Sequence, residues 1–476
     1  MPTPSITFEG GNNSDNFNYN FSEVLPPDTE GAVGPNDYVQ VINQIITILD
    51  KTTGAVMIKE SLPGLWSNTL SICSNVTLGD PIVMYDHISD RWVISEIAAS
   101  NVDFITGAPI GPFFECIAAS TTGDPTGSYY LSALPINPVN LPGGGTDQTP
   151  LNDYPKMVVW PDAYYMSTNL YGGSGFNNFE GVRVFAIDRN QLLAGQSAEV
   201  VYIDNPPNAD FTPKPGIFSM LPSSYDGALP PVGEPNHYIG VVTPGETGFP
   251  ALRVFDFHVD FTTPSNSTFT EHAGSPIPVN TFNSTMCADP NGNCVPQPGG
   301  NPNLEVLSDR LMWRLQYRNF GSYEALVTNH TVVGPSGQAA VRYYDLRNSS
   351  LGGPFSVHDE ATYAPDANSR WMGSAAMDHD GDLVVGYSVS SASVAPSIRY
   401  AGRSSSQTGG LLLGENTFLA GGGEQSNAIA RWGDYSALMI DPTDDCTFWY
   451  TNEYYSVTSD AAFQTRIGSF KFPNCP

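Results

Sequence analysis

The chain has 476 residues, of which 40% are hydrophobic and only 14% are charged, and its formal net charge is −29. Binding to nucleic acid or to anionic membranes requires clustered Lys and Arg, so this composition excludes both as expected partners. No apolar run approaches the roughly 20 residues that a membrane helix needs, and we expect no membrane insertion. Abundant Gly, Pro and aromatic residues, together with scarce helical periodicity, are typical of an all-β protein.

A hairpin pattern recurs along the chain: two runs of β-branched and aromatic residues flank a turn rich in Asp, Pro, Asn and Gly. Its occurrences are 31–43, 81–95, 156–168, 219–242, 313–331, 374–388 and 436–450. Several are followed by a third strand-like run, such as 182–188 and 252–257. A hairpin with a third strand and room for a fourth is a propeller blade. The sequence therefore predicts one seven-bladed β-propeller domain over residues 1–476.

The repeats are spaced by roughly 65 residues, more than in common propeller families. The surplus lies in stretches rich in Gly, Pro and Ser at 135–150, 205–235, 275–303 and 403–426. We interpret these stretches as long loop insertions, because a propeller closes as a ring and needs no internal domain boundary. The N-terminal segment 1–28 contains the strand-like run 5–9, which we expect to complete the last blade. Two stacked β-sandwiches are the structural alternative, and the number of repeats disfavours them.

Six cysteines are present: Cys73, Cys116, Cys287, Cys294, Cys446 and Cys475. The absence of a Cys-x-x-Cys motif disfavours a zinc ribbon or a redox dithiol. Cys287 and Cys294 bracket a turn-rich loop that a disulfide would close. We pair Cys446 with Cys475 at the C-terminus, which leaves Cys73 with Cys116. Disulfides form in oxidising compartments, so we expect a secreted, extracellular or cell-surface protein, and we expect it to be a monomer.

Several motifs resemble those of a family of large secreted bacterial proteins. They are Gly79-Asp-Pro-Ile-Val, Asp90-Arg-Trp, Asp153-Tyr-Pro-Lys-Met-Val-Val-Trp-Pro-Asp-Ala-Tyr-Tyr, Arg431-Trp-Gly-Asp-Tyr-Ser-Ala-Leu-Met and Cys446-Thr-Phe-Trp-Tyr-Thr-Asn-Glu-Tyr-Tyr. The resemblance covers most of the chain, from about residue 28 to residue 472, and implies a propeller fold and secretion without transferring catalytic residues. The architecture also resembles the sialidase-like propellers. A Ser-x-Asp-x-Gly-x-x-Trp box is missing, which counts against sialidase activity.

Charged residues recur at the start of the predicted innermost strands, where the mouth of a propeller channel lies. The candidate catalytic carboxylates are Asp80, Asp153 and Asp434, and the candidate substrate-binding residues are Lys156, Arg314, Arg370, Arg431, Trp371, Trp432 and Tyr435. Carboxylates can act on a glycosidic bond as acid, base or nucleophile, arginines hold anionic groups, and aromatic rings stack on sugars. The competing interpretation is that these charges form ion pairs that bridge neighbouring blades.

The turn Asp378-His-Asp-Gly-Asp382 resembles the beginning of a calcium loop, with Asp378, Asp380 and Asp382 as candidate ligands. It lacks the distal Glu and the flanking helices of an EF-hand, and such a hairpin turn also forms without metal. The loop 289–293 is a second candidate of the same kind. We expect a structural calcium ion and no organic cofactor. His-Glu-x-x-His and Gly-x-Ser-x-Gly motifs are absent, which disfavours a zinc protease and an α/β-hydrolase.

These features predict a secreted, carbohydrate-directed propeller with an extracellular glycan as its partner. One hypothesis is an enzyme, a glycoside hydrolase or polysaccharide lyase with its site at the channel mouth. The alternative is a non-catalytic extracellular protein that serves in binding, adhesion or surface structure. Propellers host many activities, so the predicted fold does not decide between the two.

Overall fold

The computed structural model describes residues 1–67, 72–103, 105–142, 144–173, 175–287 and 292–475. Strands dominate this part of the chain, and its α-helices are short: Asn13–Asn20 (α1), Arg189–Leu193 (α2) and Pro244–Thr247 (α3). The prediction of an essentially all-β chain is confirmed. Among the described helices, none has the length and apolar character needed to cross a membrane.

Most strands belong to antiparallel sheets of four strands in which neighbours in sequence pair. Three of these sheets are β2–β5 (Glu30–Val33, Asp37–Ile42, Ile45–Asp50, Val56–Ser61), β6–β9 (Thr77–Asp86, Arg91–Val102, Pro109–Ser120, Tyr129–Pro135) and β12–β15 (Leu151–Val159, Ala163–Gly172, Asn178–Asp188, Val200–Asn205). A fourth is β27–β30 (Ser369–Met377, Leu383–Ser391, Val394–Arg403, Glu415–Leu419). The hairpins predicted at 31–43, 81–95, 156–168 and 374–388 coincide with the first two strands of these sheets.

The sheet that contains the C-terminal strands also takes up the N-terminal one. Its order is β1-β33-β32-β31, with bounds Ile6–Asn12, Gln464–Phe470, Phe448–Tyr454 and Ala437–Ile440. Strand β1 pairs with β33 in antiparallel register from Ile6 opposite Ser469. Both ends of the chain are thereby held in one sheet.

A nine-stranded sheet departs from the expectation of separate four-stranded blades. It comprises β16–β19 (Leu221–Asp226, Asn236–Val242, Ala251–His258, Thr268–Glu271), the short β20 (Ile277–Pro278) and β23–β26 (Leu311–Asn319, Glu324–Val333, Ala339–Arg347, Ser356–Tyr363). Its two halves are joined by parallel pairing of β16 with β23, from Ser223 opposite Leu315 to Asp226 opposite Arg318.

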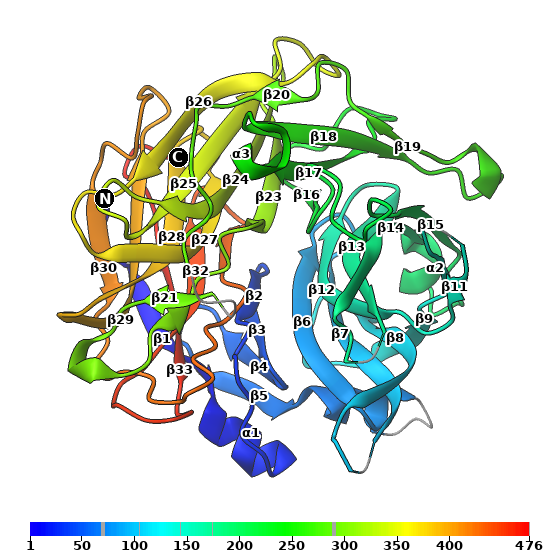
Figure 1. The fold of residues 1–476 in the computed structure, drawn as a ribbon, viewed down its shortest axis with the longest axis horizontal. Helices are drawn as coiled ribbons and strands as arrows, with labels where there is room; N and C mark the ends of the chain where they lie inside the picture. Colours follow the sequence, from blue (N-terminus) through cyan, green and yellow to red (C-terminus); the bar gives the residue numbers. More distant parts are fainter. Residues whose placement is uncertain (68–71, 104, 143, 174, 288–291, 476) are drawn as a thin grey trace.

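The first strands of these units form a closed ring. Contacts link β2 with β6, β6 with β12, β12 with β16, β16 with β23, β23 with β27, β27 with β31 and β31 with β2. In Figure 1, β2, β6, β12, β16 and β23 lie around the middle of the molecule, while outer strands such as β9 and β19 lie toward its periphery. The arrangement places these first strands near the centre of the molecule.

Packing between the sheets follows from the alternation of side chains along each strand. Val39 and Val41 of β3 join Trp92 and Ile94 of β7 in one buried cluster, whereas Tyr38 of β3 belongs to another. Successive residues of a strand point to opposite faces, so β3 buries both faces against neighbouring sheets. Each fully buried large apolar side chain contributes about 1.5–3 kcal/mol to folding.

The regions expected to be loop insertions contain some regular structure. Region 135–150 holds the hairpin β10–β11 (Val139–Asn140, Thr146–Asp147), and β21 (Asn293–Val295) pairs with β22 (Leu304–Glu305) at the end of region 275–303. Strand β16 lies within 205–235 and β30 within 403–426. The prediction that these regions are loops is therefore confirmed only in part, because each of them contains at least one short strand.

All three expected disulfides are present: Cys73–Cys116, Cys287–Cys294 and Cys446–Cys475. The last joins the turn before β32 to the end of the chain after β33. Disulfides persist in oxidising compartments, so the three bonds fit an extracellular protein.

A bulge recurs near the beginning of several first strands. Residues with positive φ include Asp80 at 52°, Tyr154 at 55° and Met372 at 48°. The pairing register of β6, β12 and β27 shifts around these same residues. A bulge redirects the side chains that follow it, and Asp tolerates the left-handed region better than most residues. These bulges position the acidic side chains described next.

Candidate functional site

Carboxylates from separate sheets gather where the first strands begin. Asp28 precedes β2, and its side chain accepts hydrogen bonds from Asn43 Nδ2 at 2.7 Å and from the Asp434 backbone N–H at 2.9 Å. Asn43 Oδ1 accepts the backbone N–H of Asp80 at 2.9 Å. A single amide side chain thus connects Asp28 with Asp80, and Asp434 is joined to the same group through its backbone.

Electrostatic repulsion links the ionisation of these carboxyl groups to one another. Burial raises the pKa of Asp153 to about 7, and the charges of Asp80 and Asp434 contribute to that increase. Burial, Asp434 and, for Asp28, Asp80 also raise the pKa values of Asp80 and Asp28. Neighbouring acids that disfavour one another's ionisation hold protons at a pH where isolated acids would not. The predicted candidates Asp80, Asp153 and Asp434 therefore lie in one cluster.

Lys156 is buried next to this cluster. Its Nζ is 3.1 Å from the centroid of the Tyr154 ring and 3.7 Å from that of Tyr435, and it donates to the Pro155 carbonyl at 3.1 Å. Burial lowers the pKa of Lys156 to about 7, against the opposing effect of Asp80 and Glu30. Tyr435 in turn donates its hydroxyl to Asp80 Oδ2 at 3.1 Å. Lys156 and Tyr435, both predicted as substrate-binding residues, are thus buried and contact the acidic cluster from within the protein.

Arg431 connects the cluster to the carboxyl group of Glu305, which the sequence did not predict as a site residue. Its Nε donates to Glu305 Oε2 at 2.5 Å and its Nη2 to Asp434 Oδ1 at 2.8 Å. The Arg431 side chain is 36% exposed, so it also faces solvent. Burial and the charge of Asp434 raise the pKa of Glu305 to about 7, although Arg431 acts in the opposite direction.

A cavity of about 880 Å³ opens beside this group. Its walls include Glu305, Asp309, Arg310 and Arg431. A second cavity, of about 520 Å³, shares Asp309 with the first and is lined by aromatic side chains, namely Tyr171, Phe179 and Phe218. Ligand sites commonly combine apolar walls with a few converging polar groups, and these volumes fall in their usual size range.

Arg310 organises the boundary between the two cavities. It donates to Asp309 Oδ1 at 2.7 Å, and its guanidinium lies 5.0 Å from the ring centroids of both Tyr154 and Phe218. The ion pair with Arg310 outweighs desolvation and lowers the pKa of Asp309, whose side chain is more than half exposed. Asp309 and Glu305 each pair with an arginine at this cavity, but their pKa values are shifted in opposite directions.

Four predicted binding residues lie elsewhere. Arg314 is buried and pairs with Asp226 beside a small cavity of about 50 Å³. Arg370 is only 1% exposed and pairs with Asp366 and Glu415 in the sheet β27–β30. The buried rings of Trp371 and Trp432 lie 5.6 Å apart in the protein interior, where neither offers a face to solvent. The structure does not bring these four side chains to the cavity beside Glu305.

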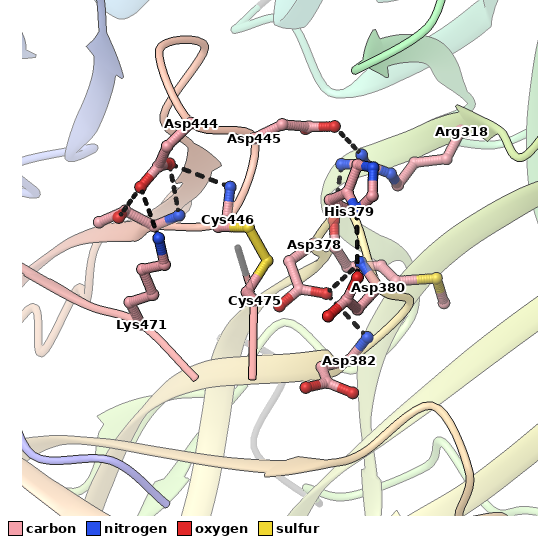
Figure 2. The surroundings of a disulfide bond; sticks show 12 residues. Arg318, Asp378, His379, Asp380, Asp382, Asp444, Asp445, Cys446, Lys471 and Cys475 are labelled. Carbon is pink, nitrogen blue, oxygen red and sulfur yellow. Dashed lines mark hydrogen bonds and ion pairs between the residues drawn. A yellow bond between two sulfur atoms is a disulfide. The ribbon is translucent and has the colours of Figure 1, made fainter. Parts of the chain in front are cut away.

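The candidate calcium turn is closed by its own backbone. Asp378 Oδ1 accepts the backbone N–H groups of Asp380 at 3.0 Å and Asp382 at 2.9 Å, and Asp382 Oδ1 accepts from the Ser405 N–H at 2.7 Å. Figure 2 shows this turn next to the Cys446–Cys475 disulfide. The second candidate loop, 289–293, falls largely outside the described residues. Calcium remains a prediction at both places.

Sequence comparison identifies no relative: no family model matches the chain, and neither does any curated protein. Solved structures with distant similarity include a protein of unknown function from Dyadobacter fermentans, at 13% identity and TM-score 0.43 over 83% of this chain and 95% of that one. An α-L-arabinofuranosidase from Fusarium graminearum has 10% identity and TM-score 0.42 over 84% and 94%. A Hadza microbial sialidase has 10% identity and TM-score 0.39 over 92% and 74%. These likenesses are too distant to transfer an activity or a site.

Proposed function

We propose that the chain is a single-domain, seven-bladed β-propeller, in which the nine-stranded sheet represents two blades joined by the β16–β23 pairing. The ring of contacts among the first strands supports this count, and it disfavours two stacked sandwiches because β31 returns to β2. The pairing of β1 with β33 closes the ring in the way that propellers remove exposed edges. Three disulfides support the proposal that the protein is secreted.

We further propose that it is a glycoside hydrolase acting at the cavity lined by Glu305 and Arg431. This proposal rests on two carboxyl groups, those of Glu305 and Asp434, that contact the same guanidinium in different surroundings. Glu305 has a pKa of about 7 and lines the cavity, whereas Asp434 accepts a charge-assisted hydrogen bond from Arg431. Because both acids contact Arg431, they cannot lie much further apart than the roughly 5–9.5 Å that separates paired carboxyls in glycosidases.

In this proposal Glu305 donates its proton to the glycosidic oxygen of the leaving group. Asp434 is the second carboxyl group, which stabilises positive charge at the anomeric carbon or activates the nucleophile. Asp153 and Asp80, whose pKa values are raised, are further groups nearby that can bind or release a proton. Arg431 fixes the two acids, and its exposed part provides a contact for an anionic sugar substituent.

The test is a screen of soluble oligosaccharides, neutral and anionic, followed by Glu305→Gln and Asp434→Asn on any substrate that is cleaved. We expect each change to lower kcat by about 10²- to 10⁴-fold, the usual contribution of a general acid or base. Asp124→Asn is the matched control, because Asp124 is an exposed turn residue. Unchanged turnover in both cluster variants would show that the acids are wrongly assigned.

A non-catalytic glycan-binding role is the second candidate, and the internal ion pairs favour it. Arg310 is paired with Asp309, and Arg431 contacts both Glu305 and Asp434, so much of the charge at the cavity is already neutralised. This role predicts saturable binding on a glycan array without release of product. Binding that disappears in Arg431→Ala, with no cleavage of the bound glycan, would favour it over hydrolysis.

A further inference from the structure

One more cluster of titratable side chains lies in the sheet β16–β19. His237 of β17 is the direct partner of Asp256 in β18, and His272 directly follows the edge strand β19. The ligand atoms of these three side chains all lie within 4.8 Å of one another. Throughout the described part of the chain, no other set of His, Cys, Asp or Glu meets this condition.

The ring nitrogens of both histidines face oxygen atoms on two sides. His237 Nδ1 is 2.8 Å from Asp256 Oδ1, and His272 Nδ1 is 2.9 Å from Asp256 Oδ2. On the opposite side, His237 Nε2 is 3.2 Å from Glu234 Oε1, and His272 Nε2 is 3.3 Å from the Gly353 carbonyl. Each histidine thus presents its Nδ1 to the shared carboxylate and its Nε2 to a separate acceptor.

A neutral imidazole carries one N–H, so each of the two neutral rings can donate toward only one of the two oxygen atoms that it faces. The ring centroids are 5.5 Å apart. A divalent cation between the two Nδ1 atoms and Asp256 would use the Nδ1 lone pairs and leave the Nε2–H of each ring to face its own oxygen atom.

We propose that His237 Nδ1, His272 Nδ1 and the Asp256 carboxylate bind a divalent transition-metal ion of the zinc type. Two imidazoles and one carboxylate form a donor set that suits Zn²⁺, whereas calcium and magnesium prefer oxygen ligands. Histidines that bind a metal commonly donate their other N–H to a carboxylate or a backbone carbonyl. Glu234 and the carbonyl of Gly353 stand in those two positions.

The surroundings fit an ion held at the sheet edge. Phe355 contacts both rings, with centroid distances of 5.2 Å to His237 and 5.3 Å to His272, and it walls off one side of the cluster. The Asp256 side chain is 24% exposed, which leaves a route for the ion and room for a water ligand. The metal would fasten the segment after β19 to β17 and β18, so its role is structural and independent of Glu305.

The test is a titration of the chelator-stripped full chain with ZnCl₂, reading bound zinc per chain and thermal unfolding, with CaCl₂ as the comparison ion. We expect one tightly bound zinc that excess calcium does not displace, and a rise in Tm on zinc binding, since a ligand that binds only the folded state stabilises it. Co²⁺ substitution adds a visible absorption band that reports nitrogen and oxygen ligands.

Variants separate this site from adventitious binding to acidic surface groups. We expect His272→Gln and Asp256→Asn to weaken zinc binding by more than the roughly 10- to 100-fold typical of lost outer partners, and Glu234→Gln to weaken it by about 10-fold. The control is His379→Gln, because His379 is exposed and its Nδ1 lies 3.0 Å from Asp380 Oδ1. Wild-type protein without stoichiometric zinc, or His272→Gln with unchanged affinity, would overturn the proposal. The wild-type measurement decides the matter even if a variant fails to fold.

Discussion

Glu115 provides a sharp test of the electrostatics of this fold, because it is a buried acid remote from solvent. It lies on β8 between sheets and accepts a hydrogen bond from Asn152 Nδ2 at 2.9 Å. Burial raises the pKa of Glu115 from 4.5 to about 8, an effect that a nearby Asp80 increases. Glu96, on the neighbouring strand, is likewise buried, and its pKa is also raised.

The sign of the effect follows from linkage. The folded state binds the Glu115 proton more tightly than the unfolded state, so its contribution to stability is complete below about pH 4.5 and is lost as the pH rises through about 8. At about 1.4 kcal/mol per pKa unit, the difference corresponds to about 5 kcal/mol as an upper limit. Glu115→Gln removes this ionisation while keeping an oxygen that can accept from Asn152.

The assay is urea unfolding of wild type and Glu115→Gln at pH 5, 7 and 9. We expect nearly equal free energies of unfolding at pH 5 and a variant that is more stable by a few kcal/mol at pH 9. Glu23→Gln is the control, since Glu23 is exposed. Parallel loss of stability in wild type and Glu115→Gln between pH 5 and 9 would refute the reasoning.

Three further predictions follow from other charged groups. If the chain hydrolyses glycans with Glu305 as acid, kcat should fall as the pH rises past about 7, and a pH–rate profile that stays flat up to pH 9 would contradict this role. Arg403→Met should destabilise the fold by about 3 kcal/mol in urea unfolding, because buried Asp359 loses this cation while Asp345 keeps its pair with Arg347; a loss below about 1 kcal/mol would contradict this reasoning. Calcium bound at the Asp378–Asp382 turn should raise Tm in wild type but not in Asp380→Asn; equal shifts in both proteins would place the ion elsewhere.

The strands were predictable because their signals are local. Alternating apolar residues around turns such as Pro81–Ser95 define a hairpin without reference to the rest of the chain. The parallel pairing of Ser223 with Leu315 joins residues far apart in sequence, and no local pattern reports it. The nine-stranded sheet was missed for that reason, whereas its two inner hairpins, predicted at 219–242 and 313–331, were found.

The site was harder to predict because bulges and loops decide which residues meet. A period of two predicts which face a side chain occupies only until a bulge shifts the register, as it does between Trp371 and Ser374. Trp371 therefore packs inside the molecule although its position in the repeat suggested the channel mouth. Glu305 was missed because it lies on the two-residue strand β22 at the end of a Gly- and Pro-rich region, outside every repeat.

The contrast between Arg370 and Arg431 separates the two interpretations of the recurring charges. The Arg370 side chain is 1% exposed and pairs with Glu415 of β30 in its own sheet and with Asp366 just before β27, so its charge is used in folding. Arg431 is 36% exposed and bridges Glu305 of β22 to Asp434 at the edge of a cavity. Burying an ion pair stabilises little by itself, and an Arg left partly open between two acids retains donors for a ligand. Of these two predicted binding residues, only Arg431 therefore has a partly exposed side chain beside a cavity, which makes it the better candidate for contact with a ligand.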